Sequence, residues 1–247
     1  MPIPDPVAFN IFGIDIMWYA ILICSGIILA TLICCLRAPR HDLTSDQILN
    51  FVLICVPAGI IGARIYYVLF HWDWYAGDFF HMINIRGGGL AVHGGIIAGL
   101  GTALILCHIW KIRPLNLFDL AAPSLALAQA IGRWGNYFNS EAHGGPTDLP
   151  WAITVDGQPV HPTFLYESIW CFLLFLFLLW LDRRRGFEGQ IILLYGILYS
   201  VERFFVEALR TDSLMIGPFK QAQVISLVII AICLVAYIVL RRKGRKA

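Results

Sequence analysis

The sequence predicts an all-α polytopic membrane protein that crosses the bilayer about seven times. Two features of its composition favour this fold class. Apolar residues make up 59% of the chain and charged residues 14%, whereas a water-soluble domain carries about a quarter charged residues. The mean hydropathy is +0.73. In addition, long apolar runs recur along the chain, and each can span the hydrocarbon core of a bilayer as a helix.

Seven apolar runs have spanning length. The first and the last contain no charged residue, and each of the others contains one to three charged or histidine residues. No internal repeat or low-complexity linker divides the chain, so we expect a single transmembrane domain over residues 1–247. The spanning helices are expected at residues 16–36, 47–70, 88–110, 116–134, 163–181, 189–209 and 221–240.

Basic residues assign the two sides of the membrane. Clusters of arginine and lysine follow the first, third, fifth and seventh runs, and by the positive-inside rule these ends are cytoplasmic. The N-terminus is then outside and the C-terminus cytoplasmic. The longest connection, residues 135–162, lies outside in this topology. It contains turn signals such as Asp156-Gly157, so we expect a small external cap with one hairpin.

Ionisable residues gather at one depth in this topology. Arg64, His93, Arg133, Arg203 and Glu207 all fall toward the outer ends of their helices, while the inner halves are almost free of charge. Ionisable groups inside a membrane are costly and indicate a functional site by default. We therefore expect a polar site facing the outer leaflet. Its further members at this depth are expected to be Tyr19, Asn136, Asn139, Glu141 and Glu167.

The sixth run carries a polar stripe. Tyr195, Tyr199, Arg203 and Glu207 recur at intervals of four residues and therefore share one helix face. Arg210 lies seven residues after Arg203, close to the same stripe. Such a stripe in a membrane helix must face protein or a wet cavity rather than lipid.

Two arginines at the same depth suit an anionic ligand. Arg133 and Arg203 can each bind phosphate through a bidentate guanidinium fork. Glycines at 87–89 and 94–95 flank His93. Glycine allows close backbone approach, and the free amides of a helix start favour a phosphate.

Several of these residues also have an ordinary structural interpretation. Arg64 can pair with a carboxylate for packing alone, and Asp119 is expected to serve as an N-terminal helix charge. Arg203 and Glu207 can form an intrahelical ion pair without any ligand. Glu202 is expected to point away from the stripe.

Residues 132–144 read GRWGNYFNSEAHG and match the pattern G-R-x-G-N-[aromatic]-x-N-x-E-x-x-G. This pattern resembles the signature of the prolipoprotein diacylglyceryl transferase family. Further stretches agree in the same order along nearly the whole chain, at residues 18–19, 62–64, 88–95, 161–167 and 199–207. Seven spans with the N-terminus outside also match that family.

The resemblance implies an enzyme of the bacterial cytoplasmic (inner) membrane. It would move the diacylglyceryl group of phosphatidylglycerol onto the lipobox cysteine of a prolipoprotein signal peptide, forming a thioether and releasing glycerol 1-phosphate. This is the first step of lipoprotein maturation. We expect no cofactor, no nucleic acid partner and a monomer. No metal is expected either, because the seven cysteines lie in apolar runs without metal-ligand spacing.

The resemblance also suggests roles within the site. Arg133 and Arg203 would hold the phosphate, and His93 is the candidate general base, with Glu207 as the alternative base. Glu141 and Glu207 can instead orient the arginines. The residues expected to bind substrate are Tyr19, Arg64, Gly94, Asn136, Asn139, Glu141, Gly144, Tyr199 and Arg210.

Three other classes of protein compete with this interpretation. A membrane transporter of a small anion would also place arginines in the membrane, but inverted repeats are not apparent and the inner halves are apolar. An intramembrane protease lacks support because the chain contains no GxSG or HExxH motif. A structural scaffold would not need buried arginines on several helices.

Overall fold

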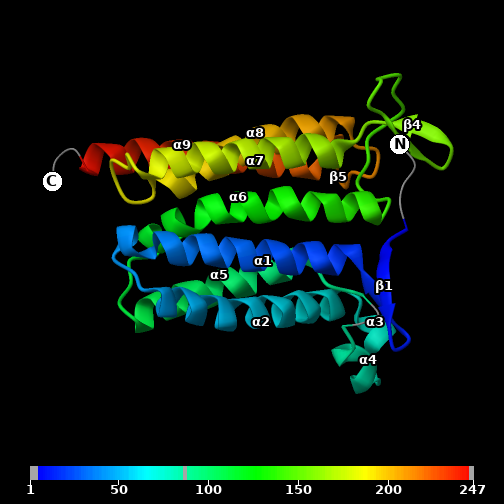
Figure 1. Ribbon diagram of the computed structural model, residues 1–247, viewed down its shortest axis with the longest axis horizontal. Coiled ribbons are helices and arrows are strands. Elements are labelled where there is room, and N and C mark those ends of the chain that lie inside the picture. The colour runs from blue at the N-terminus through cyan, green and yellow to red at the C-terminus, as the bar shows by residue number, and fades with distance from the viewer. Residues whose placement is uncertain (1–4, 86–87, 245–247) are drawn as a thin grey trace. The chain divides into compact units, whose positions relative to one another are not determined.

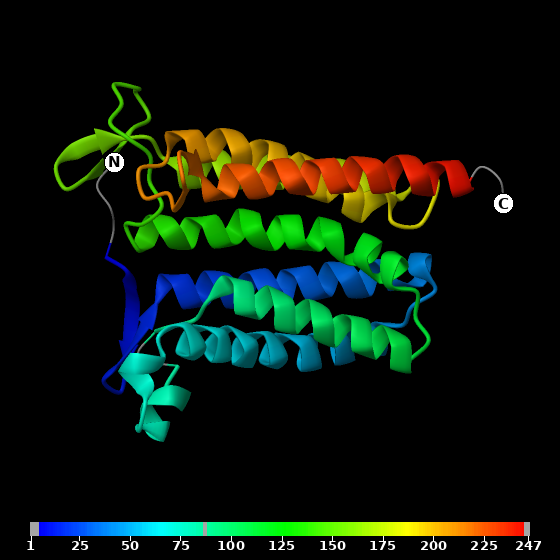
Figure 2. The same ribbon diagram turned by 180° about the vertical axis from the view of Figure 1, so that it is seen from behind.

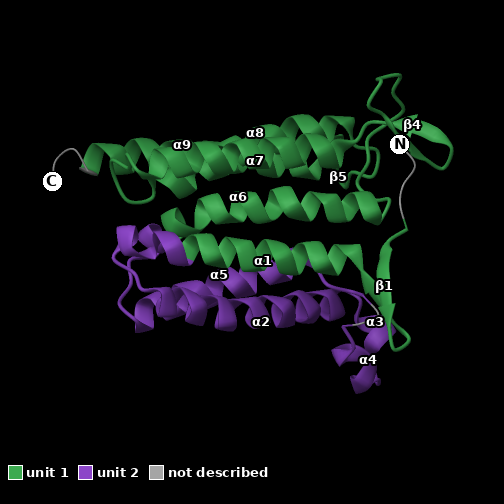
Figure 3. Ribbon diagram, viewed as in Figure 1, with its two compact units in different colours: residues 1–34, 118–247 green, residues 35–117 purple. Residues whose placement is uncertain are grey.

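The computed structural model describes residues 5–85 and 88–244, which are mainly helical (Figure 1). Gly87, one of the glycines predicted to flank His93, and the preceding Arg86 lie outside the described residues. The chain divides into two compact units, and each is described by itself (Figure 3). The first unit comprises residues 1–34 and 118–247, and the second comprises residues 35–117.

Seven long helices occupy the seven predicted runs in the described parts of the chain. Six of them are long and apolar enough to cross a membrane. The seventh, α8, is not among these six, because it contains three charged residues. The helices are α1 (Trp18–Arg37), α2 (Ser45–Phe70), α5 (Val92–Ile109), α6 (Pro114–Phe138), α7 (Thr163–Asp182), α8 (Gln190–Leu209) and α9 (Gln221–Gly244).

Two predicted helix starts are wrong. The first run was expected to begin at residue 16, but β2 (Ile14–Met17) pairs there with β1 (Val7–Ile11) in an antiparallel hairpin. Its apolar strand residues extended the apparent run. The third run was expected from residue 88, but Gly88 and Gly89 have φ values of +85° and +77°. Such left-handed backbone cannot belong to a right-handed helix, so α5 begins only at Val92.

In the second unit, α2 and α5 pack closely through small residues. A Cβ atom on Gly94 would lie 2.4 Å from the carbonyl oxygen of Gly62, and one on Gly62 would lie 2.2 Å from the Cβ of Ala98. Only glycine fits at such a contact. The unit is completed by three short helices, the 3₁₀ helix η1 (Ala38–His41), α3 (Trp72–Tyr75) and α4 (Phe79–Ile83).

The core of the first unit lies among α6, α7 and α8. On its other side α8 packs against α9, and the two run side by side in both views (Figures 1 and 2). Gly196 permits this contact, because a Cβ there would lie 2.9 Å from the Cys233 sulfur. The buried core residues are Ala122, Ala126, Leu174, Phe175, Leu178 and Ile191.

Asp119 fastens the start of α8. Its carboxylate accepts hydrogen bonds from the backbone amides of Gly189, Ile191 and Ile192 at 2.8–2.9 Å, and it pairs with Arg185 at 3.3 Å. A carboxylate at a helix N-terminus satisfies orphan amides and complements the helix dipole. Asp119 was predicted to be an N-terminal charge of its own helix; instead it lies within α6 and caps α8.

The predicted hairpin of the cap is confirmed. Strands β3 (Ile153–Val155) and β4 (Gln158–Val160) pair antiparallel around Asp156 and Gly157. Both turn residues have positive φ, 49° and 79°, which a two-residue type I′ turn requires and which an Asp-Gly pair favours. A second short hairpin, β5 (Met215–Ile216) and β6 (Phe219–Lys220), precedes α9 and was not predicted.

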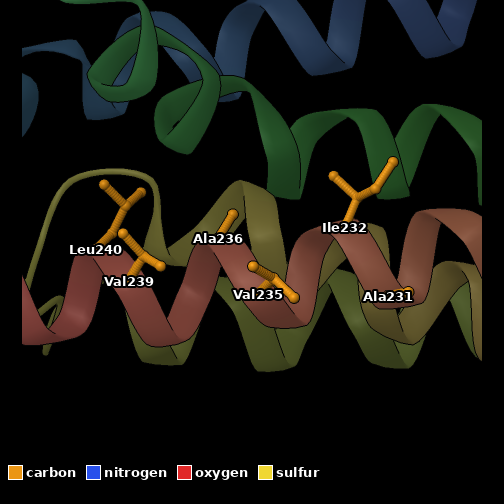
Figure 4. Close-up of a pocket in the computed structure, with 6 residues that line it drawn as sticks. All are labelled: Ala231, Ile232, Val235, Ala236, Val239 and Leu240. Atoms are coloured by element: carbon orange, nitrogen blue, oxygen red, sulfur yellow. The ribbon is translucent and has the colours of Figure 1, made fainter.

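A shallow apolar hollow of about 590 Å³ runs along α9 (Figure 4). Its lining side chains are all aliphatic, which suits contact with lipid acyl chains rather than with a polar ligand. The lining residues are Ala231, Ile232, Val235, Ala236, Val239 and Leu240.

Candidate active site

A single buried carboxylate holds the two predicted arginines together. Glu167, on α7, is 0% exposed. Its Oε1 atom lies 2.8 Å from Nη1 of Arg203 on α8, and its Oε2 atom lies 3.1 Å from Nη1 of Arg133 on α6. Three helices therefore meet at one carboxylate, and it fixes two guanidinium groups side by side.

Each arginine has a second partner on α8. Nη2 of Arg203 pairs with Oε2 of Glu207 at 2.5 Å, one helical turn away. Nη2 of Arg133 donates a hydrogen bond to the Tyr199 hydroxyl at 3.1 Å. We call these four residues, together with Glu167, the arginine cluster. The structure thus brings together four of the residues predicted for the site: Arg133, Tyr199, Arg203 and Glu207.

The predicted stripe on α8 faces protein. The rings of Tyr195 and Tyr199 stack with centroids 5.8 Å apart, and the Tyr195 hydroxyl donates to the side-chain oxygen of Gln129 on α6 at 2.9 Å. A hydrogen bond also joins α6 to α7, since the Trp134 indole donates to the Ser168 hydroxyl at 3.1 Å. These bonds hold the cluster's helices in register.

The accessible part of the cluster is cationic. The side chains of Arg133 and Arg203 are 18% and 19% exposed, while those of Glu167 and Glu207 are 0% and 3% exposed. A guanidinium group has five N–H donors, and its contacts with two partners leave others available. The arrangement can therefore present paired guanidinium donors to an anion while its own carboxylates stay covered.

Two carboxyl groups of this region were missed or misplaced. Glu167 was predicted only at the right depth, although it is the lone charged residue of its run. Glu202 was expected to point away, and that expectation is wrong. Its side chain is 5% exposed, and its carboxyl group lies in the neighbourhood of Arg133, Glu167 and Arg203.

The end of α8 is held by its own set of contacts. Arg210 binds Asp212 in a bidentate pair at 2.8–2.9 Å, and these hydrogen bonds hold the pKa of the Asp212 carboxyl below its ordinary value. The ammonium group of Lys220 donates to the carbonyl oxygens of Glu207 and Arg210, each at 2.7 Å. This cation completes the C-terminus of the helix, where free carbonyl groups favour positive charge.

Gly144 of the family signature lies against the end of α8. Its backbone forms a bridge with Arg210, and its amide donates to the carbonyl of His161 at 2.9 Å. A Cβ atom at this position would lie 2.6 Å from the Cβ of His161, so only glycine fits. The structure thus brings Gly144 and Arg210 together, as predicted for one site.

The remaining predicted residues of the first unit lie around the end of α6. The ring of Tyr19 rests on Gly135, where a Cβ atom would lie 2.5 Å from the ring. Asn136 is half-buried, whereas Asn139 and Glu141 are exposed and are joined by a hydrogen bond of 3.3 Å. Their polar groups are thus available just beyond the end of α6, and their roles in binding stay predictions.

In the second unit, Arg64 binds backbone carbonyls from two places. Its guanidinium group donates to those of His81 and Met82 on α4 and to those of Gly88 and Gly89 at 2.7–3.0 Å, and it lies over the ring of Tyr75 at 5.0 Å. Arg64 was expected to pair with a carboxylate if its role was packing alone; its partners are backbone carbonyls instead. A role for Arg64 in binding substrate stays a prediction.

His93 and Gly94 open α5 in this second unit. We expected His93 near a buried site, but its side chain is exposed at the first turn, with its ring centroid 6.4 Å from that of Tyr66. The two residues that follow it, Gly94 and Gly95, have no side chains that could cover the imidazole. Gly94 is buried at the contact with α2, so the structure gives it a packing role.

The residues that the structure describes contain no group of three or more His, Cys, Asp or Glu side chains arranged to hold a metal ion. The arginine cluster offers donors to an anion instead, and two of its three helices, α6 and α7, are long and apolar enough to cross a membrane. These features define the class: a multi-pass membrane protein with a half-buried pair of arginines bridged by a buried carboxylate.

Comparison with known proteins gives the family. The family model for prolipoprotein diacylglyceryl transferase matches residues 6–239. The phosphatidylglycerol–prolipoprotein diacylglyceryl transferase of Clostridioides difficile is 52% identical, over 98% of this chain and 97% of that protein. The enzymes of that name from Finegoldia magna (49% identical; 98% and 96% covered) and Bacillus cytotoxicus (41%; 99% and 95%) are also similar. The chain belongs to the prolipoprotein diacylglyceryl transferase family.

Proposed function

We propose that this chain transfers the diacylglyceryl group of phosphatidylglycerol to the lipobox cysteine thiol of prolipoproteins, releasing glycerol 1-phosphate. Its membership of the family and the names of its relatives support this activity. The structural observation that supports specific residues for this activity is that Arg133 and Arg203 both pair with the carboxylate of Glu167. The transporter alternative is not favoured by these relatives.

The chemistry of the substrate suits the arginine cluster. Phosphatidylglycerol carries one negative charge on its phosphodiester, at the depth of the lipid headgroups. A carbon–sulfur bond forms while the bond between the lipid glycerol carbon and the phosphate oxygen breaks, and its electron pair leaves with the phosphate. Arg133 and Arg203 would bind that phosphate and stabilise the charge that develops on it.

A base must take the proton of the cysteine thiol, because the thiolate is the nucleophile. We assign this role to His93, whose imidazole is exposed at the first turn of α5 and can accept a proton through a ring nitrogen. Glu207 is the alternative base. Its carboxylate is buried and engaged with Arg203, so we assign it the role of orienting that arginine.

The proposal includes a membrane topology. Seven helices cross the bacterial cytoplasmic membrane, with the N-terminus outside, the C-terminus inside and the active site toward the outer leaflet. The basic ends of alternate helices support this orientation. In this topology α8 also spans, because its charged stripe faces protein. We further propose a monomer of one transmembrane domain, with residues 135–162 as an external cap and without cofactor or metal.

The direct test is glycerol phosphate release from phosphatidylglycerol by the purified protein with a lipobox peptide. A peptide with serine in place of the cysteine is the control substrate. We expect release only with the cysteine peptide. Arg133→Ala and Arg203→Ala should abolish it in folded protein, whereas Arg183→Ala, an exposed arginine at the far end of α7, should keep it. Release that is independent of the cysteine would overturn the proposed transfer.

A further inference from the structure

Glu202 is a buried carboxyl group that the proposed mechanism does not use. It lies on α8 directly before Arg203, and both of its carboxylate oxygens are buried without a hydrogen-bond partner among the described residues. Buried polar groups in proteins almost always have such a partner, and an ionised carboxylate without one is especially unfavourable. The state of this group therefore needs an explanation.

The charges around Glu202 are already balanced without it. Arg133 and Arg203 contribute two positive charges, and their partners Glu167 and Glu207 contribute two negative charges, each carboxylate in an ion pair. An ionised Glu202 would add a third negative charge with no ion pair, inside an apolar helix bundle. Membrane interiors disfavour such an unpaired charge strongly.

The neighbouring helices bring no further cation to it. From α6 it faces Arg133, from α7 Glu167 and Cys171, and on α8 itself Arg203. Helix α9, which packs against α8, carries only Cys233 and Tyr237 as titratable side chains before its basic end. Both arginines that Glu202 faces are already held by other carboxylates.

We infer that Glu202 is held as a neutral carboxylic acid, and that an anion binds to Arg133 and Arg203 only while Glu202 keeps its proton. With Glu202 neutral, the cluster has no net charge, and its exposed guanidinium groups can donate hydrogen bonds to one anionic phosphate. With Glu202 ionised, the cluster is negative and repels the same phosphate. This inference rests on the proposed function and adds to it a proton-dependent control of substrate binding. Glu202 acts through the arginines and is a positioning residue.

The sign of the effect follows from this linkage. Raising the pH ionises Glu202, so the affinity for an anion falls as pH rises through its titration. Because one proton is coupled to binding, the dissociation constant should rise by up to about tenfold per pH unit there. The reverse also holds, since a bound anion makes Glu202 harder to ionise.

The test measures binding of short-chain phosphatidylglycerol to the full-length protein in detergent from about pH 5 to about pH 9. This probe is a phosphodiester and keeps one negative charge throughout, so any pH dependence belongs to the protein. Glu202→Gln keeps the shape of the side chain but cannot ionise, and Glu202→Met is a second neutral variant. Asp148→Asn, an exposed acid of the cap, is the matched control.

We expect the affinity of the wild type and of Asp148→Asn to fall with rising pH. The two neutral variants at Glu202 should bind equally well across the range, and Glu202→Asp should restore a pH dependence. A wild-type affinity that does not change with pH, or a Glu202→Gln profile that overlays that of the wild type, would overturn the inference.

A parallel assay of glycerol phosphate release keeps this inference distinct from the proposed function. Wild-type protein that binds the lipid in a pH-dependent way but transfers nothing to the cysteine peptide would overturn the transfer activity alone. Transfer by both the wild type and Glu202→Gln with identical pH profiles of binding would overturn the role of Glu202 alone.

Discussion

Two regions of the molecule bury an arginine in different ways. Arg64, in the second unit, donates its guanidinium hydrogen bonds to backbone carbonyls of α4 and of Gly88 and Gly89. Arg133 and Arg203, in the first unit, are held by side-chain carboxylates and keep part of each guanidinium accessible. A buried arginine is therefore not by itself a sign of a ligand site. The partners differ between the two cases: backbone carbonyls occupy the donors of Arg64, whereas a shared carboxylate holds Arg133 and Arg203 side by side, as the proposed phosphate site requires.

The largest expected effect comes from Glu167→Gln. A neutral amide cannot hold two like-charged guanidinium groups together, so the clamp for the phosphate should be lost. We expect glycerol phosphate release to fall by about 100-fold or more. The buried arginines would also lose their counter-ion, at a cost of about 3 kcal/mol in stability. The rate is therefore measured per folded protein, and a near-normal rate would refute the clamp.

Arg64→Ala should act on stability instead. The backbone carbonyls of α4 and of Gly88 and Gly89 would lose their charged donor, which lowers the free energy of unfolding by about 3 kcal/mol. Thermal unfolding and limited proteolysis measure the effect. A large loss of turnover in a variant as stable as the wild type would contradict a purely structural role for Arg64.

The contact between α2 and α5 gives a smaller effect. Gly94→Ala places a methyl group against the backbone of Gly62 and should destabilise the protein by about 1–3 kcal/mol. Gly101→Ala, on the same helix with open space around its Cα, is the matched control and should stabilise it by about 0.5–1 kcal/mol. Equal effects at the two positions would show that helix propensity alone is at work.

The smallest expected effect concerns Asp212. Arg210 holds the pKa of its carboxyl below the ordinary value, so the pair contributes stability above the unfolded pKa and loses it as pH falls through the folded pKa. Asp212→Asn should therefore lower the melting temperature slightly near neutral pH and leave it unchanged in acid. Asp148→Asn serves as the comparison. A difference that grows toward acid would have the wrong sign.

Apolar runs predicted the long helices well, because the spanning length and the absence of charge are local properties of the sequence. Asp156-Gly157 predicted its hairpin for the same reason, since its turn chemistry is local. The contacts of the site are not local. Nothing in the sequence spacing relates Glu167 to Arg133 and Arg203, which lie on two other helices, so its central place emerged only from the packing.

Errors in the prediction have similar physical origins. Ile14 and Ile16 lengthened an apolar run although they belong to a strand, because hydropathy does not distinguish a strand from a helix end. Glu202 was placed off the stripe by its helical angle, which ignores that neighbouring helices cover more than one face of α8. The family signature had already indicated the activity that the relatives' names support.

The carboxylate shared by Arg133 and Arg203 also bears on the speed with which an anion can bind. Two guanidinium groups side by side repel each other, and bringing them together around a ligand would require rearrangement at the moment of encounter. Glu167 removes that barrier, since the work against this repulsion is done once, when the chain folds. In the proposed reaction, the lipid phosphate would then meet guanidinium groups that are already oriented, and little reorganisation would remain for the catalytic step.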